Sequence, residues 1–216
     1  MAGIKLLNIG KTYRNKIILK DFNVLINEGE FVVFSGESGS GKSTLLNIIG
    51  GIEEPDMGIL IIDNNNISSM SKNAKRKFFQ KNVSFIFRGF YLEPMLTIEE
   101  NICLPGVFAG MPSRKRKDRA EVLIKILGLG GLQKKLPAEI SGAQIARACI
   151  ARALFLEPKF LLIDDPTRDL DNKNAENIIK ILKLFQEKTH LTTIVATHDT
   201  SVAPYATKII NLGAQK

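Results

Sequence analysis

The sequence predicts an α/β protein whose core is a mainly parallel β-sheet covered by helices. After a first third that is rich in strand-like runs, strands and helices alternate along the chain, and this alternation favours parallel strands joined by helices. A glycine-rich loop also lies between an apolar strand and an apolar helix, a connection typical of such sheets. The 216 residues allow one large domain, or one domain with a subdomain, at roughly 100–200 residues per domain.

Apolar patterns place the individual elements in order. In the first third, short runs typical of strands lie at residues 17–19, 22–26 and 31–35. A helix then begins in the glycine-rich segment and includes residues 45–49. Residues 97–136 change to helical spacing of apolar positions, which predicts a helical insert. Beyond the insert we expect a helix at 144–155, a strand at 159–163, a helix at 175–185, and strands at 192–197 and 208–212.

Composition narrows the class of protein but does not identify its binding partner. The chain has 30 Lys and Arg residues against 22 Asp and Glu, a net charge of +8, which suits a nucleotide, lipid head groups or nucleic acid. Cys103 and Cys149 have no CxxC spacing, as expected of a reducing compartment. The pattern of a secretion signal is not visible, and no apolar run approaches the roughly 20 residues that cross a bilayer. If the protein acts at a membrane, we expect it to lie on the surface.

A phosphate-binding loop is the strongest motif in the sequence. Residues 36–43 satisfy GxxxxGK(S/T) directly after the strand at 31–35 and before an apolar helix, which is the context that this motif requires. The glycines let consecutive backbone N–H groups face an anion, Lys42 reaches the β- and γ-phosphates, and the Ser43 hydroxyl can bind Mg²⁺. The alternative is a Gly/Ser-rich turn that binds nothing. The predicted binding residues are Gly36, Glu37, Ser38, Gly39, Ser40, Gly41, Lys42, Ser43 and Thr44.

Two carboxylates follow the apolar strand at residues 159–163. Asp164 comes directly after this run and is the expected Mg²⁺ ligand near the phosphate loop. Asp165 follows it, where a second carboxylate can polarise a water molecule. An apolar run that ends in Asp is common by itself, so this prediction depends on the phosphate loop upstream.

Residues 140–154 carry the resemblance to a known family. Ser141, Gly142 and Gln144, with the Ala/Arg-rich residues 145–154, resemble the LSGGQ signature motif and the following helix of ATP-binding-cassette (ABC) ATPases. The position of this segment, between the phosphate loop and the acidic strand, is also that of the family.

Three further segments agree with the same family. Residues 166–171 resemble its D-loop, His198 resembles its switch histidine, and Tyr13 is similar to the aromatic residue that stacks on adenine. The resemblance covers essentially the whole chain and implies a P-loop NTPase of the ABC cassette type. Such a cassette has a mainly parallel sheet core, an antiparallel β region and a helical subdomain. We therefore expect one domain over residues 1–216, with its core at about 1–87 and 158–216 and its helical subdomain at about 88–157.

The resemblance also implies how the chain works. It would bind ATP and Mg²⁺, with Asp165, His198 and the residue at position 88 acting around the γ-phosphate. Two cassettes enclose two ATP molecules, so that residues 141–144 of each act in trans. ATP closes the dimer, hydrolysis opens it, and the cycle drives an integral membrane permease that docks beside residues 88–94. The dimer is a homodimer or a heterodimer with another cassette, and the expected location is the cytoplasmic, inner face of the cell membrane.

Four positions around this chemistry depart from the family pattern. Arg88 stands where the family places Gln, and a guanidinium has no acceptor, so it cannot ligate a cation; it can pair with a phosphate or a carboxylate instead. Asp165 replaces the usual Glu and withdraws the carboxylate by ~1 Å, which can cost on the order of 100-fold in rate. Ala143 replaces the second glycine of the signature motif, and Arg168 with Asp169 replaces a small or amide pair in the D-loop.

These departures lead to the hypothesis that the chain binds ATP tightly and hydrolyses it slowly. In a homodimer, both sites would carry Arg88, Asp165 and Ala143, so neither site would match the family pattern. The alternative is that neighbouring residues compensate, for example an acid that holds Arg88.

Similarity within the family favours the branch that serves lipoprotein release, macrolide and peptide export, and cell division. Residues 45–53 and 90–102 carry this similarity. It predicts an ATP-hydrolysing transport subunit of the lipoprotein-release or peptide/macrolide type; the alternative is an ATP-switch module that regulates a membrane partner, as in cell division. The basic clusters at 72–81 and 113–119 are typical of solvated helix faces or contacts with anionic lipid, so nucleic acid is not expected as a partner.

Overall fold

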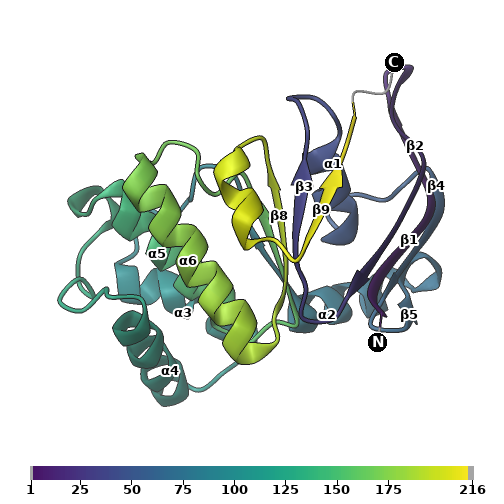
Figure 1. The fold of residues 1–216 in the computed structure, drawn as a ribbon. Helices are drawn as coiled ribbons and strands as arrows, with labels where there is room; N and C mark the ends of the chain where they lie inside the picture. Colours follow the sequence, from purple (N-terminus) through teal and green to yellow (C-terminus); the bar gives the residue numbers. More distant parts are fainter. Residues whose placement is uncertain (1, 214–216) are drawn as a thin grey trace.

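A five-stranded parallel sheet in the order β6-β7-β8-β3-β9 forms the centre of the protein (Figure 1). The structure is a computed structural model and describes residues 2–213. This sheet confirms the predicted fold class. Its strands are β3 (Phe31–Ser35), β6 (Val83–Ile86), β7 (Phe160–Asp164), β8 (Thr192–Thr197) and β9 (Lys208–Asn211).

A second, antiparallel sheet has the order β2-β1-β4-β5. It consists of β1 (Ala2–Tyr13), β2 (Lys16–Asn27), β4 (Met57–Ile62) and β5 (Asn65–Asn66). The runs expected at 17–19 and 22–26 belong to one strand of 12 residues, β2, and the apolar pattern did not predict β1. Arg14 and Asn15, with φ of 44° and 66°, connect β1 to β2. Two consecutive positive φ angles are typical of the type I′ turn, whose twist matches that of a hairpin.

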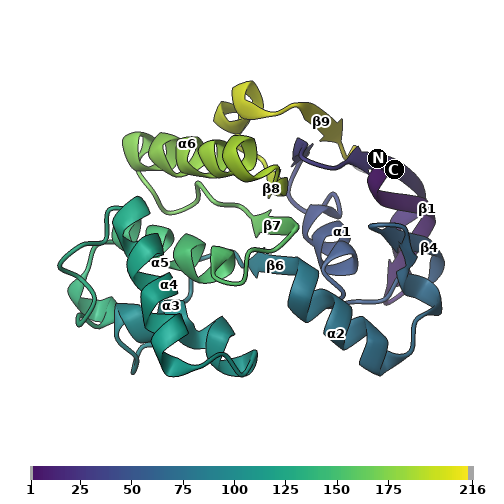
Figure 2. The ribbon, with the colours of Figure 1, turned by 90° about the horizontal axis from the view of Figure 1, so that it is seen from below.

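Helices cover both faces of the parallel sheet. They are α1 (Lys42–Ile49), α2 (Lys72–Asn82), α3 (Ile98–Phe108), α4 (Ser113–Ile126), α5 (Gly142–Leu154) and α6 (Asn172–Thr189), with short 3₁₀ turns η1 (Ile67–Ser69), η2 (Pro137–Glu139) and η3 (Thr200–Tyr205). Figure 2 shows α3, α4 and α5 together on one side, and α1 and α2 with the antiparallel sheet on the other. The subdomain boundaries remain a prediction. No helix between residues 2 and 213 is long and apolar enough to cross a membrane.

Each central strand contributes alternate residues to two hydrophobic clusters. Phe31 and Val33 of β3 pack with residues of α3, α4, α5 and α6. Val32 and Phe34 face the other way and pack with α1 and the antiparallel sheet. Because both faces are covered, the central strands are continuous apolar runs rather than alternating ones, which explains why their sequences were easy to recognise.

The ends of four parallel strands are level with one another. Ser35 lies opposite Thr197, Asp164 lies opposite Ala196, and Ile86 pairs with Ile163. The loops that follow β3, β6, β7 and β8 therefore leave the sheet at one edge, where ligands bind in open parallel sheets.

Buried Asn101 fixes the loop between β6 and α3. Its side-chain oxygen accepts from the Glu93 backbone N–H at 2.7 Å. Its amide nitrogen lies 3.0–3.1 Å from the carbonyl oxygens of Glu93, Leu96 and Thr97. This loop carries Arg88 at its start, so Asn101 helps to determine where that side chain can lie.

We expect Asn101→Ala to lower the free energy of unfolding by about 2–3 kcal/mol, because it leaves several buried backbone groups without partners. Urea unfolding measures this change. Thr97→Ala is the matched control: it removes the N-cap of α3, whose hydroxyl accepts from the Glu100 N–H, and should cost only ~1 kcal/mol. Equal losses in the two variants would contradict the role given to Asn101.

Candidate functional site

A cleft of about 790 Å³ lies at the carboxyl edge of the parallel sheet. It brings together the phosphate loop, the segment after β7 and the segment after β8, which are far apart in the sequence. Its lining residues are Ile18, Glu37, Ser38, Gly39, Gly41, Lys42, Ser43, Thr44, Arg88, Asp164, Asp165, Arg168, Ala196, Thr197 and His198.

The phosphate loop wraps around the ammonium group of Lys42. The Nζ atom donates to the carbonyl oxygens of Gly36 at 2.8 Å and Glu37 at 2.7 Å. Gly36 has φ of 152°, and a Cβ there would lie only 2.4 Å from a backbone oxygen of Leu212, so the turn requires glycine. Burial lowers the pKa of Lys42. An anion in this loop would therefore meet a desolvated cation and the N-terminus of α1, which has no side-chain cap.

The residues expected to hold Mg²⁺ are adjacent. Burial raises the pKa of Asp164, and the neighbouring Ser43 hydroxyl acts in the opposite direction. A hydroxyl and a carboxylate are the hard oxygen donors that Mg²⁺ takes, and Mg²⁺ commonly uses one or two carboxylates together with substrate phosphates. Among the described residues there is no cluster of three or more His, Cys, Asp or Glu side chains that could hold a metal. The Ser43–Asp164 pair thus fits a cation shared with phosphate.

Asp165 lies between the two other predicted catalytic side chains. Its Oδ2 atom is 3.4 Å from His198 Nδ1 and 4.0 Å from Arg88 Nε. Its Oδ1 atom accepts from the Thr197 hydroxyl at 2.9 Å. The carboxylate is buried, whereas the His198 and Arg88 side chains are more than half exposed. The three side chains therefore form a cluster in which two exposed groups flank one buried carboxylate.

Tyr13 lies at the tip of the β1–β2 hairpin. Its hydroxyl bonds to Glu53, and the Lys11 ammonium lies 5.5 Å from the ring centroid. Burial and the bond to Glu53 raise the pKa of Tyr13, while the side chain of Thr44 acts in the opposite direction. Thr44 belongs to the phosphate loop, so the Tyr13 hydroxyl lies near that loop. Stacking on adenine stays a prediction.

The signature residues lie at the N-terminus of α5 and do not line the cleft. Ser141 and Gln144 form a capping box: the Gln144 N–H donates to the Ser141 hydroxyl at 3.3 Å, and the Ser141 N–H donates to Gln144 Oε1 at 2.8 Å. Gly142 and Ala143 lie in the first turn of the helix. Because a helical backbone accepts alanine without strain, the Ala143 departure costs this chain nothing locally. Action in trans stays a prediction.

The sequence did not predict four residues that line the cleft: Ile18, Arg168, Ala196 and Thr197. In sequence, Ile18, Ala196 and Thr197 belong to predicted strands, and Arg168 is a departure in the D-loop. A polar residue at the end of a buried strand is a signal that would have found Thr197, because carboxyl ends of parallel strands form sites. The place of Ile18 depends on how the β1–β2 hairpin folds over the loop, which the sequence pattern does not specify.

Comparison with known proteins gives a consistent result. The ABC transporter family model matches residues 19–168. MJ0796 of Methanocaldococcus jannaschii, an uncharacterized ABC transporter ATP-binding protein, is 39% identical over 217 residues, covering 97% of this chain and 92% of that protein. The macrolide export ATP-binding/permease protein MacB of Mannheimia succiniciproducens is 40% identical over 195 residues, covering 90% of this chain and 30% of that longer protein.

Solved structures agree with the sequence comparison. A dimeric structure of the MJ0796 cassette in a post-hydrolysis state, bound to ADP and Pi, superposes with a TM-score of 0.88 at 38% identity. The match covers 99% of this chain and 97% of the other. A second dimeric MJ0796 structure gives a TM-score of 0.89 at 39% identity over 98% of this chain and 94% of that one.

Asp164→Asn should stabilise the protein in the absence of ligand and weaken Mg²⁺ binding at the predicted site. Burial raises the pKa of Asp164, so folding disfavours the ionised form. This penalty is absent below the unfolded pKa of about 4 and grows as pH rises through the higher folded pKa. We expect a higher melting temperature for the variant at pH 7, with the difference closing near pH 4. Mg²⁺-dependent ATP affinity should fall at least ~10-fold, since loss of even an outer-shell partner costs that much.

Asp171→Asn is the matched control. Hydrogen bonds from the Asn174 backbone and side chain lower the pKa of Asp171 at the N-cap of α6, so removal of its charge should bring no gain at pH 7. Differential scanning fluorimetry and ATP titration with and without Mg²⁺ provide the measurements. A lower melting temperature for Asp164→Asn than for the wild type at pH 7 would contradict the argument.

Proposed function

This chain belongs to the ABC transporter family, and we propose that it binds and hydrolyses ATP as the subunit that drives a separate integral membrane permease. One observation carries the proposal: the phosphate loop, the Ser43–Asp164 pair and the Asp165 cluster all open onto one cleft. The first supplies phosphate binding, the second a place for a divalent cation and the third a group that can activate water.

The residues of the cleft have separate tasks in this reaction. Lys42 and the loop amides hold the β- and γ-phosphates, and bound Mg²⁺ neutralises part of the phosphate charge. Asp165 accepts a proton from the attacking water. The water oxygen bonds to the γ-phosphorus while the bond to the bridging oxygen of ADP breaks. His198, whose side chain is 65% exposed, is accessible to donate to the transferred phosphate.

Two features support slow turnover in the isolated protein. The Asp165 carboxylate is one methylene shorter than the Glu of the family pattern, and a misplacement of ~1 Å can cost on the order of 100-fold in rate. Arg88 has donors only and lies 4.0 Å from this carboxylate, where it attracts the group that must take the proton. Both features act on the same step, so we propose that ATP binding is tight and hydrolysis is slow.

The position of the signature residues supports dimerisation. Ser141, Gly142 and Gln144 lie outside the cleft of their own chain, at an exposed helix N-terminus that suits a γ-phosphate. We propose that a second cassette presents them to the nucleotide. The two MJ0796 structures are dimeric, which supports this arrangement with either an identical chain or another cassette as the second subunit.

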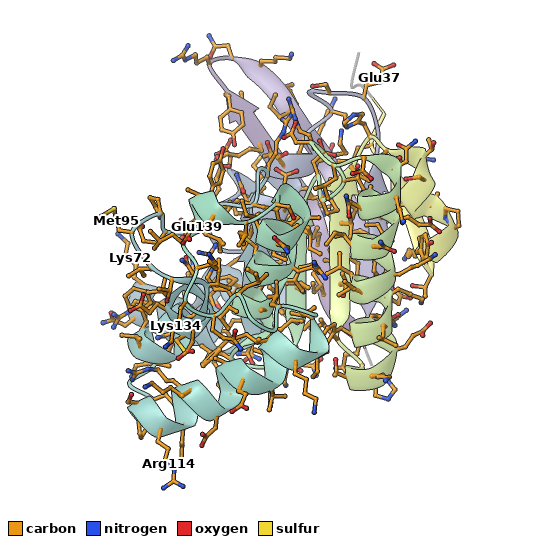
Figure 3. The ribbon with its side chains drawn as sticks, turned by 90° about the vertical axis from the view of Figure 1, so that its left-hand side faces the viewer. Glu37, Lys72, Met95, Arg114, Lys134 and Glu139 are labelled. Carbon is orange, nitrogen blue, oxygen red and sulfur yellow. The ribbon has the colours of Figure 1, made fainter. Side chains whose placement is uncertain are left out.

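An exposed apolar loop supports a membrane partner on the inner face of the cell membrane. Tyr91 is 72% exposed and Met95 is 82% exposed, and Met95 points outward from the molecule (Figure 3). Exposed apolar groups that cluster on a folded protein mark interaction sites. We propose that the permease docks at residues 88–95, and that it is of the lipoprotein-release or peptide/macrolide export type, as the similarity to MacB supports.

A second function, an ATP switch that regulates a membrane partner of the cell-division type, has a specific observation in its favour. The Arg88 guanidinium lies 4.0 Å from the Asp165 carboxylate that hydrolysis needs, whereas the phosphate loop matches its motif at every position. A switch needs ATP-dependent dimerisation more than rapid turnover. The two functions differ in whether hydrolysis limits the lifetime of the dimer.

Wild-type steady-state ATPase should lie below about 1 s⁻¹. The Asp165→Glu, Arg88→Gln double variant should be at least ~10-fold faster, because it restores the reach of the carboxylate and removes its cationic neighbour. A phosphate-release assay measures both, with Asp165→Asn as the background. The opposite result is a wild-type rate of about 1 s⁻¹ or more that does not rise in the double variant. It would show that neighbouring residues compensate for the departures and that the chain is an ordinary transport motor.

Asp165→Asn should accumulate a dimer in Mg-ATP and return to monomer in ADP, because ATP persists between the chains. Size exclusion with light scattering gives the mass. Ser141→Arg in the same background is the control and should prevent the dimer by placing a bulky cation at the trans surface. The wild type should show less dimer than Asp165→Asn if hydrolysis ends each cycle; equal dimer in both would favour the switch.

A further inference from the structure

The Thr197 hydroxyl is a buried group that the reaction described above does not use. Thr197 ends β8 and is 1% exposed. Its Oγ1 atom accepts from the Asp199 backbone N–H at 3.0 Å and donates to Asp165 Oδ1 at 2.9 Å. A hydroxyl has one hydrogen to donate. Because the Asp199 N–H occupies an acceptor position, the hydrogen of Thr197 is directed at the carboxylate.

The backbone of Asp165 turns its side chain toward Thr197. Asp165 has φ of 51°, a left-handed conformation that Asp tolerates better than most residues. Its N–H donates to the carbonyl oxygen of Ala196 at 2.8 Å, which extends the pairing of β7 with β8 by one residue. The carboxylate therefore lies over the end of β8, beside the Thr197 hydroxyl.

The two carboxylate oxygens of Asp165 have different surroundings. Oδ1 is held by Thr197 inside the protein. Oδ2 faces the exposed side chains of His198 and Arg88 at 3.4 and 4.0 Å. Fixing one oxygen of a planar carboxylate determines where the other points, so Thr197 selects Oδ2 as the oxygen that faces the cleft.

We propose that Thr197 is a positioning residue for ATP hydrolysis, and that it holds the short Asp165 carboxylate so that Oδ2 receives the proton of the attacking water. This assignment rests on the proposed hydrolytic function. The interaction depends on side-chain length: a Glu at position 165 would carry its carboxylate about one methylene farther from the backbone. The dependence of turnover on Thr197 is therefore a property of the aspartate in this chain.

Thr193 provides a matched control on the same strand. It is fully buried on β8, and its hydroxyl has no hydrogen-bond partner within the described part of the chain. Thr193→Val and Thr197→Val make the same chemical change at two buried positions of β8. Only the second removes a bond to Asp165. Loss of an unpaired buried hydroxyl should leave stability unchanged or slightly increased.

The test compares Thr197→Val, Thr197→Ser and Thr193→Val by single-turnover and steady-state ATPase. Thr197→Val should lower kcat by about 10- to 100-fold, with KM within about twofold of the wild type. Thr197→Ser keeps the hydroxyl and should retain most of the wild-type kcat, and Thr193→Val should match the wild type. Melting temperatures of all variants identify any loss caused by unfolding. If Thr197→Val is too unstable to assay, Thr197→Ala compared with Thr197→Ser replaces it.

A double-mutant cycle isolates the coupling to Asp165. In the Asp165→Glu background, Thr197→Val should change kcat by less than about threefold, since the longer side chain no longer depends on the hydroxyl. An equal loss in both backgrounds would overturn the assignment, because Thr197 would then act on the strand end alone. If Thr197→Val hydrolyses ATP as fast as the wild type, only this assignment is overturned. Absence of hydrolysis in the wild type, even in single turnover, would overturn the proposed function together with it.

Discussion

The level register of four parallel strands is the constraint on which the site depends. Ser35, Asp164 and Thr197 end neighbouring strands that are paired residue by residue, so the backbone ladder itself sets the distance between the phosphate loop and the carboxylates. A slip of one strand by a single residue would turn every side chain of that strand to the opposite face. The hydrophobic clusters on both faces oppose such a slip, and in this way the core fixes the geometry of the cleft.

The cleft combines several features that each cost folding stability. Burial raises the pKa of Asp164 and lowers the pKa of Lys42, so each charged form is less favourable than in water. Asp165 adds a left-handed backbone. Outside the cleft, the buried side chain of Asn101 is hydrogen-bonded through both its oxygen and its nitrogen. The cleft therefore lowers the stability of the ligand-free protein, and bound nucleotide phosphates with Mg²⁺ would raise it again. Ligand binding and folding are linked for this reason.

The sequence predicted the features that local pattern encodes. The phosphate loop, the apolar strand before Asp164 and the strand at 192–197 follow from motif and composition. The sequence did not predict β1, because Asn8 and Gly10 weaken its strand pattern and the Arg14–Asn15 turn lacks the usual hairpin signal. Pairing with β2 stabilises this strand where the intrinsic strand propensity of its residues is low. The contacts of Asp165 with Thr197 and Arg88 depend on its backbone angle and on strands that are distant in sequence, so only three-dimensional structure reveals them.

The bonds that Lys42 makes within its own loop have a consequence for how fast a ligand can be captured. Its ammonium ties the carbonyl oxygens of Gly36 and Glu37 together, so the loop is already curved before any phosphate arrives. The conformational entropy of this segment is lost when the protein folds, so ordering the loop does not reduce the free energy of ligand binding. Entry of the phosphates then requires only that one side chain exchange two carbonyl oxygens for phosphate oxygens. Rotamer changes of exposed side chains take picoseconds to nanoseconds, so capture of a phosphate in this loop would not have to wait for a rearrangement of the backbone.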